Sequence, residues 1–339
     1  MNEKLANFLI QTGKVVTPYI VTAGVYDKMF NHRIMADQNL VFRLEDFTAL
    51  TSKRYTFKSG RNELVGYLYL KKDVKPKALV SFSHGYGGGG HKTYLDLINA
   101  MCEYGLAVFG YDATANDESQ GKGFRSFTQG VIDANNAINF IHGQKEYKKL
   151  PLIIAGHSWG AYSASNVLRY HKDAIGLVAF SGFNSATTIF KANGERYAGK
   201  EADKFMSYVD NFEEIVSGQY AKLTAIDSFK KSKAKIVIVH SQDDGTVPIE
   251  AGFNLYKKEF KDDPRFEFIK LKDRGHGTVY YTAKGKEYYD SFVASYRKFK
   301  KGHKEDEVKQ FVEANLNRLV WSNLVDQKLI DNIFDFILH

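Results

Sequence analysis

The chain has 339 residues, of which 44% are hydrophobic and 25% are charged, and these fractions are ordinary for a globular protein with a sizeable core. Cys102 is the only cysteine, which excludes an intrachain disulfide and favours a reducing compartment, so we expect a cytoplasmic protein. The net charge of +8 comes from lysines scattered among acidic residues, without an arginine-rich run, so we expect no nucleic-acid partner.

The N-terminal region has neither the pattern of a membrane span nor that of a secretion signal. No stretch approaches the roughly 20 consecutive apolar residues that cross a bilayer. Residues 15–25 are apolar, but Thr17, Pro18 and Thr22 interrupt them and no clear small-residue cleavage site follows. Packing of this region on the protein is favoured, and contact with a membrane surface is left open. The sequence does not indicate an oligomeric state.

Residues 1–50 are predicted to form a helical extension, in which Leu5, Phe8 and Leu9 share one face. A hairpin of two strands is predicted next, around a Ser-Gly-Arg-Asn turn at residues 59–62. Further strands are predicted from short apolar runs, most of them followed by a helical pattern, at residues 78–82, 106–109, 152–155 and 177–180. This alternation predicts an α/β fold with a mostly parallel central sheet flanked by helices.

The alternation of strands and helices stops at Gly182. Residues 183–232 contain no convincing strand pattern and are rich in aromatic residues, and strand patterns return after them. We therefore predict a helical cap insertion at 183–232, within an α/β core that comprises residues 51–182 and 233–339. Apolar stripes at helical spacing predict a C-terminal helical extension that closes the sheet.

The pentapeptide Gly156-His157-Ser158-Trp159-Gly160 stands between a short apolar run and a stretch of small residues that suits a helix. A buried strand, a tight turn and a helix together expose a nucleophilic serine hydroxyl. The two glycines flank the serine because a side chain at either position would crowd so sharp a turn. Ser158 is therefore a candidate nucleophile.

A nucleophilic serine needs a general base, and the base needs an acid that fixes its tautomer. Asp243 and Asp244 follow one buried-strand pattern, and His276 follows the next one, between two glycines. The order serine, aspartate, histidine is the chain order of an α/β hydrolase. With these motifs, and with His84-Gly85 after an early strand, the chain resembles the α/β-hydrolase superfamily over about residues 55–300.

The resemblance is to the esterase/lysophospholipase and serine-aminopeptidase-like branches of that superfamily. It implies that Ser158 is the nucleophile, that His276 acts as base and then as acid, and that Asp244 orients His276, with Asp243 as the alternative acid. It also implies an oxyanion hole formed by the backbone N–H groups of two residues, Tyr86 and Trp159.

Other polar residues near these motifs are expected to be structural. They include His84, His157 and Asp112, the last of which precedes the nucleophile in the chain. His91 fits an ordinary surface or loop position. No His-Glu-x-x-His or comparable spacing occurs, so we expect neither a metal site nor a cofactor.

The expected activity is that of a serine hydrolase that cleaves a carboxylic ester through an acyl-enzyme on Ser158. Its partner would be a small-molecule ester or acyl substrate, and the aromatic insertion favours an apolar group, as in a carboxylesterase or lysophospholipase. One alternative is a serine aminopeptidase or acyl-peptidase with the same triad. The free α-amino group of a peptidase substrate could be bound by acidic residues of the insertion, namely Glu195, Glu201, Asp203 and Asp210. Another is a non-catalytic binding protein on the same fold, against which an intact triad argues.

Overall fold

The computed structural model describes residues 3–339, except for the side chains of residues 3–15, 197, 198 and 201. The described strands form one sheet in the order β1-β2-β4-β3-β5-β6-β7-β8. β2 is antiparallel to both of its neighbours, whereas every pair from β4 to β8 is parallel. The strands are β1 (Leu50–Ser59), β2 (Asn62–Lys71), β3 (Leu79–Ser83), β4 (Ala107–Tyr111), β5 (Leu152–His157), β6 (Ala174–Phe180), β7 (Lys235–Ser241) and β8 (Phe266–Leu271).

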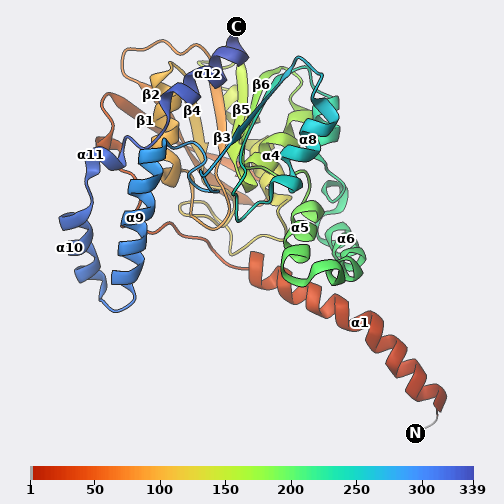
Figure 1. Cartoon of the computed structure of the whole chain (residues 1–339). Helices are drawn as coiled ribbons and strands as arrows, with labels where there is room; N and C mark the ends of the chain where they lie inside the picture. Colours follow the sequence, from red (N-terminus) through yellow and green to blue (C-terminus); the bar gives the residue numbers. More distant parts are fainter. Residues whose placement is uncertain (1–2) are drawn as a thin grey trace.

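Helices cover both faces of the sheet (Figure 1). Ile154 of β5 lies in the core under α3 and α4, while its neighbour Ile153 lies in the core on the opposite face, under α2 and α12. This two-sided burial explains why β5 is a continuous apolar run. The helices are α1 (Glu3–Phe30), α2 (Leu95–Glu103), α3 (Gln129–His142), α4 (Trp159–Val167), α5 (Ala186–Ala198), α6 (Asp203–Ser217), α7 (Ala225–Lys230), α8 (Phe253–Phe260), α9 (Ala283–Lys300), α10 (Glu305–Asn315), α11 (Arg318–Trp321) and α12 (Gln327–Leu338).

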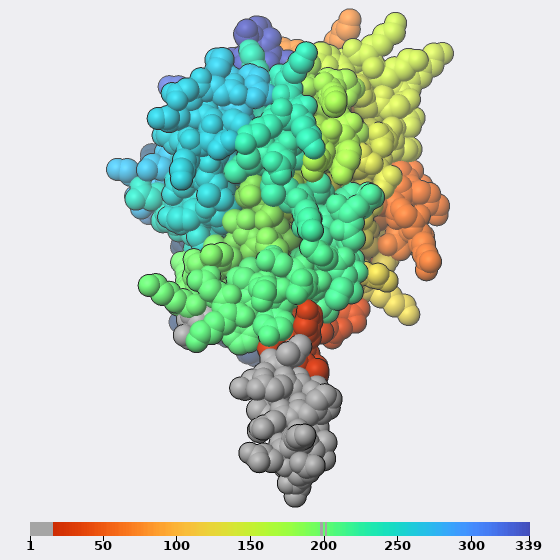
Figure 2. Space-filling view, turned by 90° about the vertical axis from the view of Figure 1, so that its right-hand side faces the viewer, coloured from red at the N-terminus to blue at the C-terminus, as the bar shows by residue number. Residues whose placement is uncertain are grey.

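Helices α5, α6 and α7 connect β6 to β7, so the predicted insertion is helical. It lies against the described part of α1 (Figure 2). The rings of Tyr19 and Tyr208 meet edge to face with centroids 5.2 Å apart, and the hydroxyl of Tyr26 donates a hydrogen bond to the buried Glu213 at 2.7 Å. The α/β fold class is confirmed. The division into domains at residues 50, 182 and 233 stays a prediction, as does the role of the insertion as a cap.

The helix predicted over residues 1–50 ends at Phe30, so the prediction is wrong for residues 31–49. Between α1 and β1, only a 3-10 turn over Leu44–Asp46 is helical. Side chains compete with helical hydrogen bonds here: the carboxylate of Asp37 accepts from the backbone N–H of Asn39 at 3.2 Å. Residues 31–49 instead cross from α1 to the vicinity of α9 and α11 (Figure 1).

The predicted apolar face of Leu5, Phe8 and Leu9 lies outside the described side chains. Within residues 3–339, we find no helix whose length and hydropathy suit a membrane span.

Candidate active site

Ser158 lies at the sharp turn between β5 and α4, with φ 57° and ψ −118°, in the left-handed region that L-residues rarely adopt. Both flanking glycines are sterically required. A methyl group at Gly156 would lie 2.3 Å from the carbonyl oxygen of Gly160, and one at Gly160 would lie 1.9 Å from the carbonyl oxygen of Ser83. The crowding expected from the pentapeptide is therefore present.

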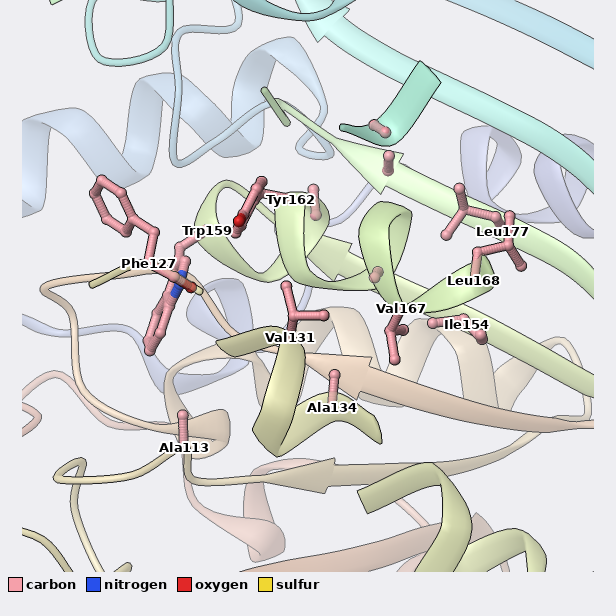
Figure 3. Close-up of a cluster of buried hydrophobic side chains, with 14 of the residues drawn as sticks. Ala113, Phe127, Val131, Ala134, Ile154, Trp159, Tyr162, Val167, Leu168 and Leu177 are labelled. Atoms are coloured by element: carbon pink, nitrogen blue, oxygen red, sulfur yellow. The ribbon is translucent and has the colours of Figure 1, made fainter. Parts of the chain in front are cut away.

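Trp159 is the first residue of α4, and its side chain packs against the segment that precedes α3. The indole N–H donates to the carbonyl of Phe127 at 2.7 Å, and the indole stacks on Phe124 with centroids 5.0 Å apart. Figure 3 shows Trp159 beside Phe127 at the start of the helix, with Val131 of α3 facing α4. The sequence assigned Trp159 only its backbone N–H, and this packing of the side chain was not predicted.

The candidate nucleophile, base and acid lie in one hydrogen-bonded row. Nε2 of His276 is 2.9 Å from Oγ of Ser158, and Nδ1 of His276 is 2.7 Å from Oδ2 of Asp244. With a neutral imidazole, the serine hydroxyl donates to Nε2 and the Nδ1–H donates to the carboxylate. Ser158 is 8% exposed and Asp244 is 6% exposed, so this row is largely shielded from water.

The two neighbouring aspartates contact different groups. Asp244 reaches His276, and its other oxygen accepts from the backbone N–H groups of Thr246 and Val247, both at 2.8 Å. Asp243 accepts from the backbone N–H groups of Arg274 and Gly275, both at 3.1 Å. Asp243 therefore holds the backbone of the loop before His276 by hydrogen bonds, whereas Asp244 is the carboxylate that contacts the imidazole of His276.

Asp244 is poised to stay ionised. Burial alone would raise the pKa of its carboxyl group, but hydrogen bonds from His240 and His276 outweigh burial and hold the pKa well below its usual value. Nε2 of His240 is 3.3 Å from the same oxygen that meets His276. The site therefore contains a second histidine behind the acid, whose role the sequence did not indicate.

The two backbone N–H groups expected to form an oxyanion hole have no acceptor among the described residues, and their role as an oxyanion hole stays a prediction. They belong to Trp159, which follows the serine, and to Tyr86, which follows Gly85. The Tyr86 hydroxyl donates to the carbonyl of Met29 at the end of α1, so the N-terminal helix helps to fix this loop.

His157 is not a base in this arrangement. Its Nε2 is 2.9 Å from the carbonyl oxygen of His276, and because a carbonyl only accepts, Nε2 carries the proton. Its Nδ1 accepts from the hydroxyl of Tyr94 at 2.9 Å, and that hydroxyl in turn accepts from the N–H of Gly85 at 3.1 Å. Burial, together with the nearby His276, lowers the pKa of His157 to about 3, which keeps it neutral.

His91 is not the surface histidine that the sequence suggested. It is completely buried, and its Nδ1 lies 2.6 Å from the carboxylate of Asp112. Its Nε2 lies 2.9 Å from the hydroxyl of Tyr69. Burial alone would raise the pKa of Asp112, but the contact with His91 lowers it. A sequence pattern could not show this pair, because its partners come from different elements.

A family model described as serine aminopeptidase, S33 matches residues 74–205. No curated protein is significantly similar to the chain in sequence. Among solved structures, an esterase from Pyrococcus furiosus is 19% identical with a TM-score of 0.57, and the match covers 79% of this chain and 96% of that one.

Two further structures are similar over most of the chain. Est1E from Butyrivibrio proteoclasticus, solved with ferulic acid, is 16% identical with a TM-score of 0.54, and the match covers 71% of this chain and 98% of that one. An acylaminoacyl peptidase from Pyrococcus horikoshii is 18% identical with a TM-score of 0.51, and the match covers 69% of this chain but 38% of that one. These likenesses show the α/β-hydrolase fold, and the family match over residues 74–205 supports the resemblance to α/β hydrolases. With the family match, they support a hydrolase.

Proposed function

We propose that the protein is a serine hydrolase that cleaves carboxylic esters through an acyl-enzyme on Ser158. The observation that carries the proposal is the hydrogen-bonded row of Ser158, His276 and Asp244 at the turn after β5. The likeness to an esterase and to Est1E favours an ester over other acyl substrates.

In the proposed reaction, Oγ of Ser158 attacks the ester carbonyl while Nε2 of His276 takes its proton. The N–H groups of Tyr86 and Trp159 bind the oxyanion, and His276 then gives its proton to the leaving alcohol. His276 next activates a water molecule that hydrolyses the acyl-enzyme. Asp244 holds the imidazole in the required tautomer and stabilises its positive form.

A panel of 4-nitrophenyl esters of increasing acyl length, beside aminoacyl 4-nitroanilides, tests the reaction. We expect Ser158→Ala and His276→Ala to lower kcat/KM for the esters by at least roughly 10³-fold, because each removes a group that acts in the transition state. Ser295→Ala, an exposed serine on α9, is the matched control and should retain full activity. Equal ester turnover by Ser158→Ala and the wild type would contradict the proposal.

The acid is tested by comparing Asp244→Asn with Asp243→Asn. Asp244→Asn should lower kcat by roughly 10²–10⁴-fold, because an amide no longer fixes the tautomer of His276. Asp243→Asn should retain most of kcat, since Asp243 binds Ser241 and the loop of Arg274 and Gly275 rather than His276. The reverse order of the two losses would assign the acid to Asp243.

The peptidase alternative is favoured by the family match and by the acylaminoacyl peptidase among the similar structures. The acidic residues that could bind an α-amino group are partly neutralised: Glu195 and Asp203 lie 3.6 and 3.2 Å from Nζ of Lys191. The side chain of Glu201 lies outside the described residues. Preferential cleavage of the anilides, with a loss in Asp210→Asn, would assign the protein to this alternative.

A further inference from the structure

A cavity of about 390 Å³ lies next to the loop of His276, although no residue of the candidate triad lines it. Its wall includes Gly277, which follows His276, and Gly87 and Gly88 of the loop that carries Tyr86. A base that protonates the leaving oxygen must have the leaving group at its side. The cavity is therefore placed to receive the leaving group of a substrate rather than its acyl chain.

The far wall of this cavity is aromatic and is held in place by contacts within the chain. Trp321 lies between Phe42 and Tyr289, with ring centroids 5.5 and 5.3 Å away. The segment that carries Phe42 is tied to α9, because Lys300 donates to the carboxylate of Asp37 at 2.7 Å. A fixed wall of aromatic rings favours a flat apolar group, since little side-chain ordering is needed on binding.

The charges on the cavity wall leave one cation available. Among the described residues that line the cavity, Asp37 is the only acid, and Lys300 neutralises it. Arg297 also lines the cavity; its side chain is exposed and forms no hydrogen bond or ion pair with any described residue. The buried indole N–H of Trp321 also has no acceptor within the described residues. An anion entering the cavity would meet a free guanidinium, and the one carboxylate among the described lining residues is paired with Lys300.

We propose that this cavity binds the leaving group of the ester and selects an aryl alcohol that carries an anion. The inference rests on the proposed function, because it names the half of the substrate that leaves from His276. Arg297 is a binding residue in this arrangement and takes no part in the chemistry. A neutral aryl alcohol occupies the same aromatic walls but lacks the ionic contact.

Two acetate esters of similar shape that differ in charge test the selection. 3-Acetoxybenzoate and 3-acetoxybenzamide release aryl alcohols of similar shape, the first with a carboxylate and the second with a neutral amide. We expect kcat/KM to favour the benzoate by roughly tenfold, as one partly exposed charge-assisted hydrogen bond provides. Arg297→Gln should reduce this ratio to about one, whereas the exposed neighbour Lys298→Gln should leave it unchanged.

The position of the charge is tested with phenyl hexanoate and the phenyl half-ester of adipic acid. These carry the difference in charge on the acyl half, so Arg297→Gln should not alter their ratio. A wild-type ratio near one for the acetoxy pair, or a ratio that survives Arg297→Gln, would overturn the inference while leaving the proposed function intact.

A measurement without turnover separates the two proposals. Isothermal titration calorimetry of Ser158→Ala should show tighter binding of 3-hydroxybenzoate than of 3-hydroxybenzamide, and the added substitution Arg297→Gln should remove the difference. If no ester is hydrolysed but this difference is measured, the proposed function fails and the anion site stands. Equal binding of the two compounds would contradict the anion site.

Discussion

The hydroxyl of Tyr94 joins two loops that must act together in the proposed reaction. It accepts from the N–H of Gly85, next to Tyr86, the proposed oxyanion residue, and it donates to His157. His157 in turn holds the backbone carbonyl of His276. The hydroxyl of Tyr94 therefore helps to position both the loop of Tyr86 and the loop of His276.

We expect Tyr94→Phe to lower kcat by roughly tenfold or more with little change in KM for small esters, because small displacements of reacting groups are costly. The variant also leaves the N–H of Gly85 and Nδ1 of His157 without partners, which should cost about 1–3 kcal/mol of stability. Tyr104→Phe is the control, since that hydroxyl binds Asp335 on the surface at 2.6 Å. A rise in KM with unchanged kcat would show that Tyr94 serves substrate binding instead.

At the scale of elements, α1 reaches the site although its sequence carries no catalytic motif. Phe30 at its end is 1% exposed and packs edge to face on Tyr86 and Phe127, with centroids 6.1 and 4.9 Å away. The carbonyl of Met29 accepts from the Tyr86 hydroxyl. The end of α1 therefore packs against the loop of Tyr86, the proposed oxyanion residue, from outside the α/β core.

Removing the packing of Phe30 should affect both stability and activity. We expect Phe30→Ala to lower the free energy of unfolding by about 3–5 kcal/mol, as is typical for a buried phenylalanine, and to lower kcat because Tyr86 loses its support. Val25→Ala, at a residue of α1 that is 45% exposed, is the control. Urea unfolding and ester kinetics measure the two effects. A loss of stability with unchanged kcat would show that α1 does not position Tyr86.

For the whole molecule, the features that the sequence predicted are those that depend on a local pattern of residues. The apolar run before Ser158 is β5. The serine, aspartate and histidine follow β5, β7 and β8, and they meet because the carboxyl ends of these parallel strands lie at one edge of the sheet. Contacts between distant segments could not be predicted. The hydrogen bond from Tyr86 to Met29 joins residues 57 positions apart, and the contact of Lys300 with Asp37 joins residues 263 positions apart. No sequence pattern in these segments indicates which distant residue each one contacts.

The stability of the whole molecule should depend on pH in two opposing ways. Burial, and then the charge of His276, lowers the pKa of His157 to about 3, so the unfolded chain takes up a proton that the folded one refuses. This contribution destabilises the fold as the pH falls from about 6.5 toward 3. Burial raises the pKa of Asp96 to about 7, so the folded chain keeps a proton that the unfolded one releases. That contribution destabilises the fold as the pH rises from about 4 to 7.

Asp96→Asn isolates the second effect, because a neutral amide keeps the acceptor for the N–H of Leu97, which Asp96 binds at 2.7 Å, and removes the buried charge. By urea unfolding, we expect the variant to be more stable than the wild type at pH 9, by on the order of 2–4 kcal/mol, and to differ little at pH 4. The exposed Asp262→Asn should show no such pH dependence. An Asp96→Asn variant that is less stable at pH 9 would show that the carboxylate is held ionised by contacts that the amide cannot make.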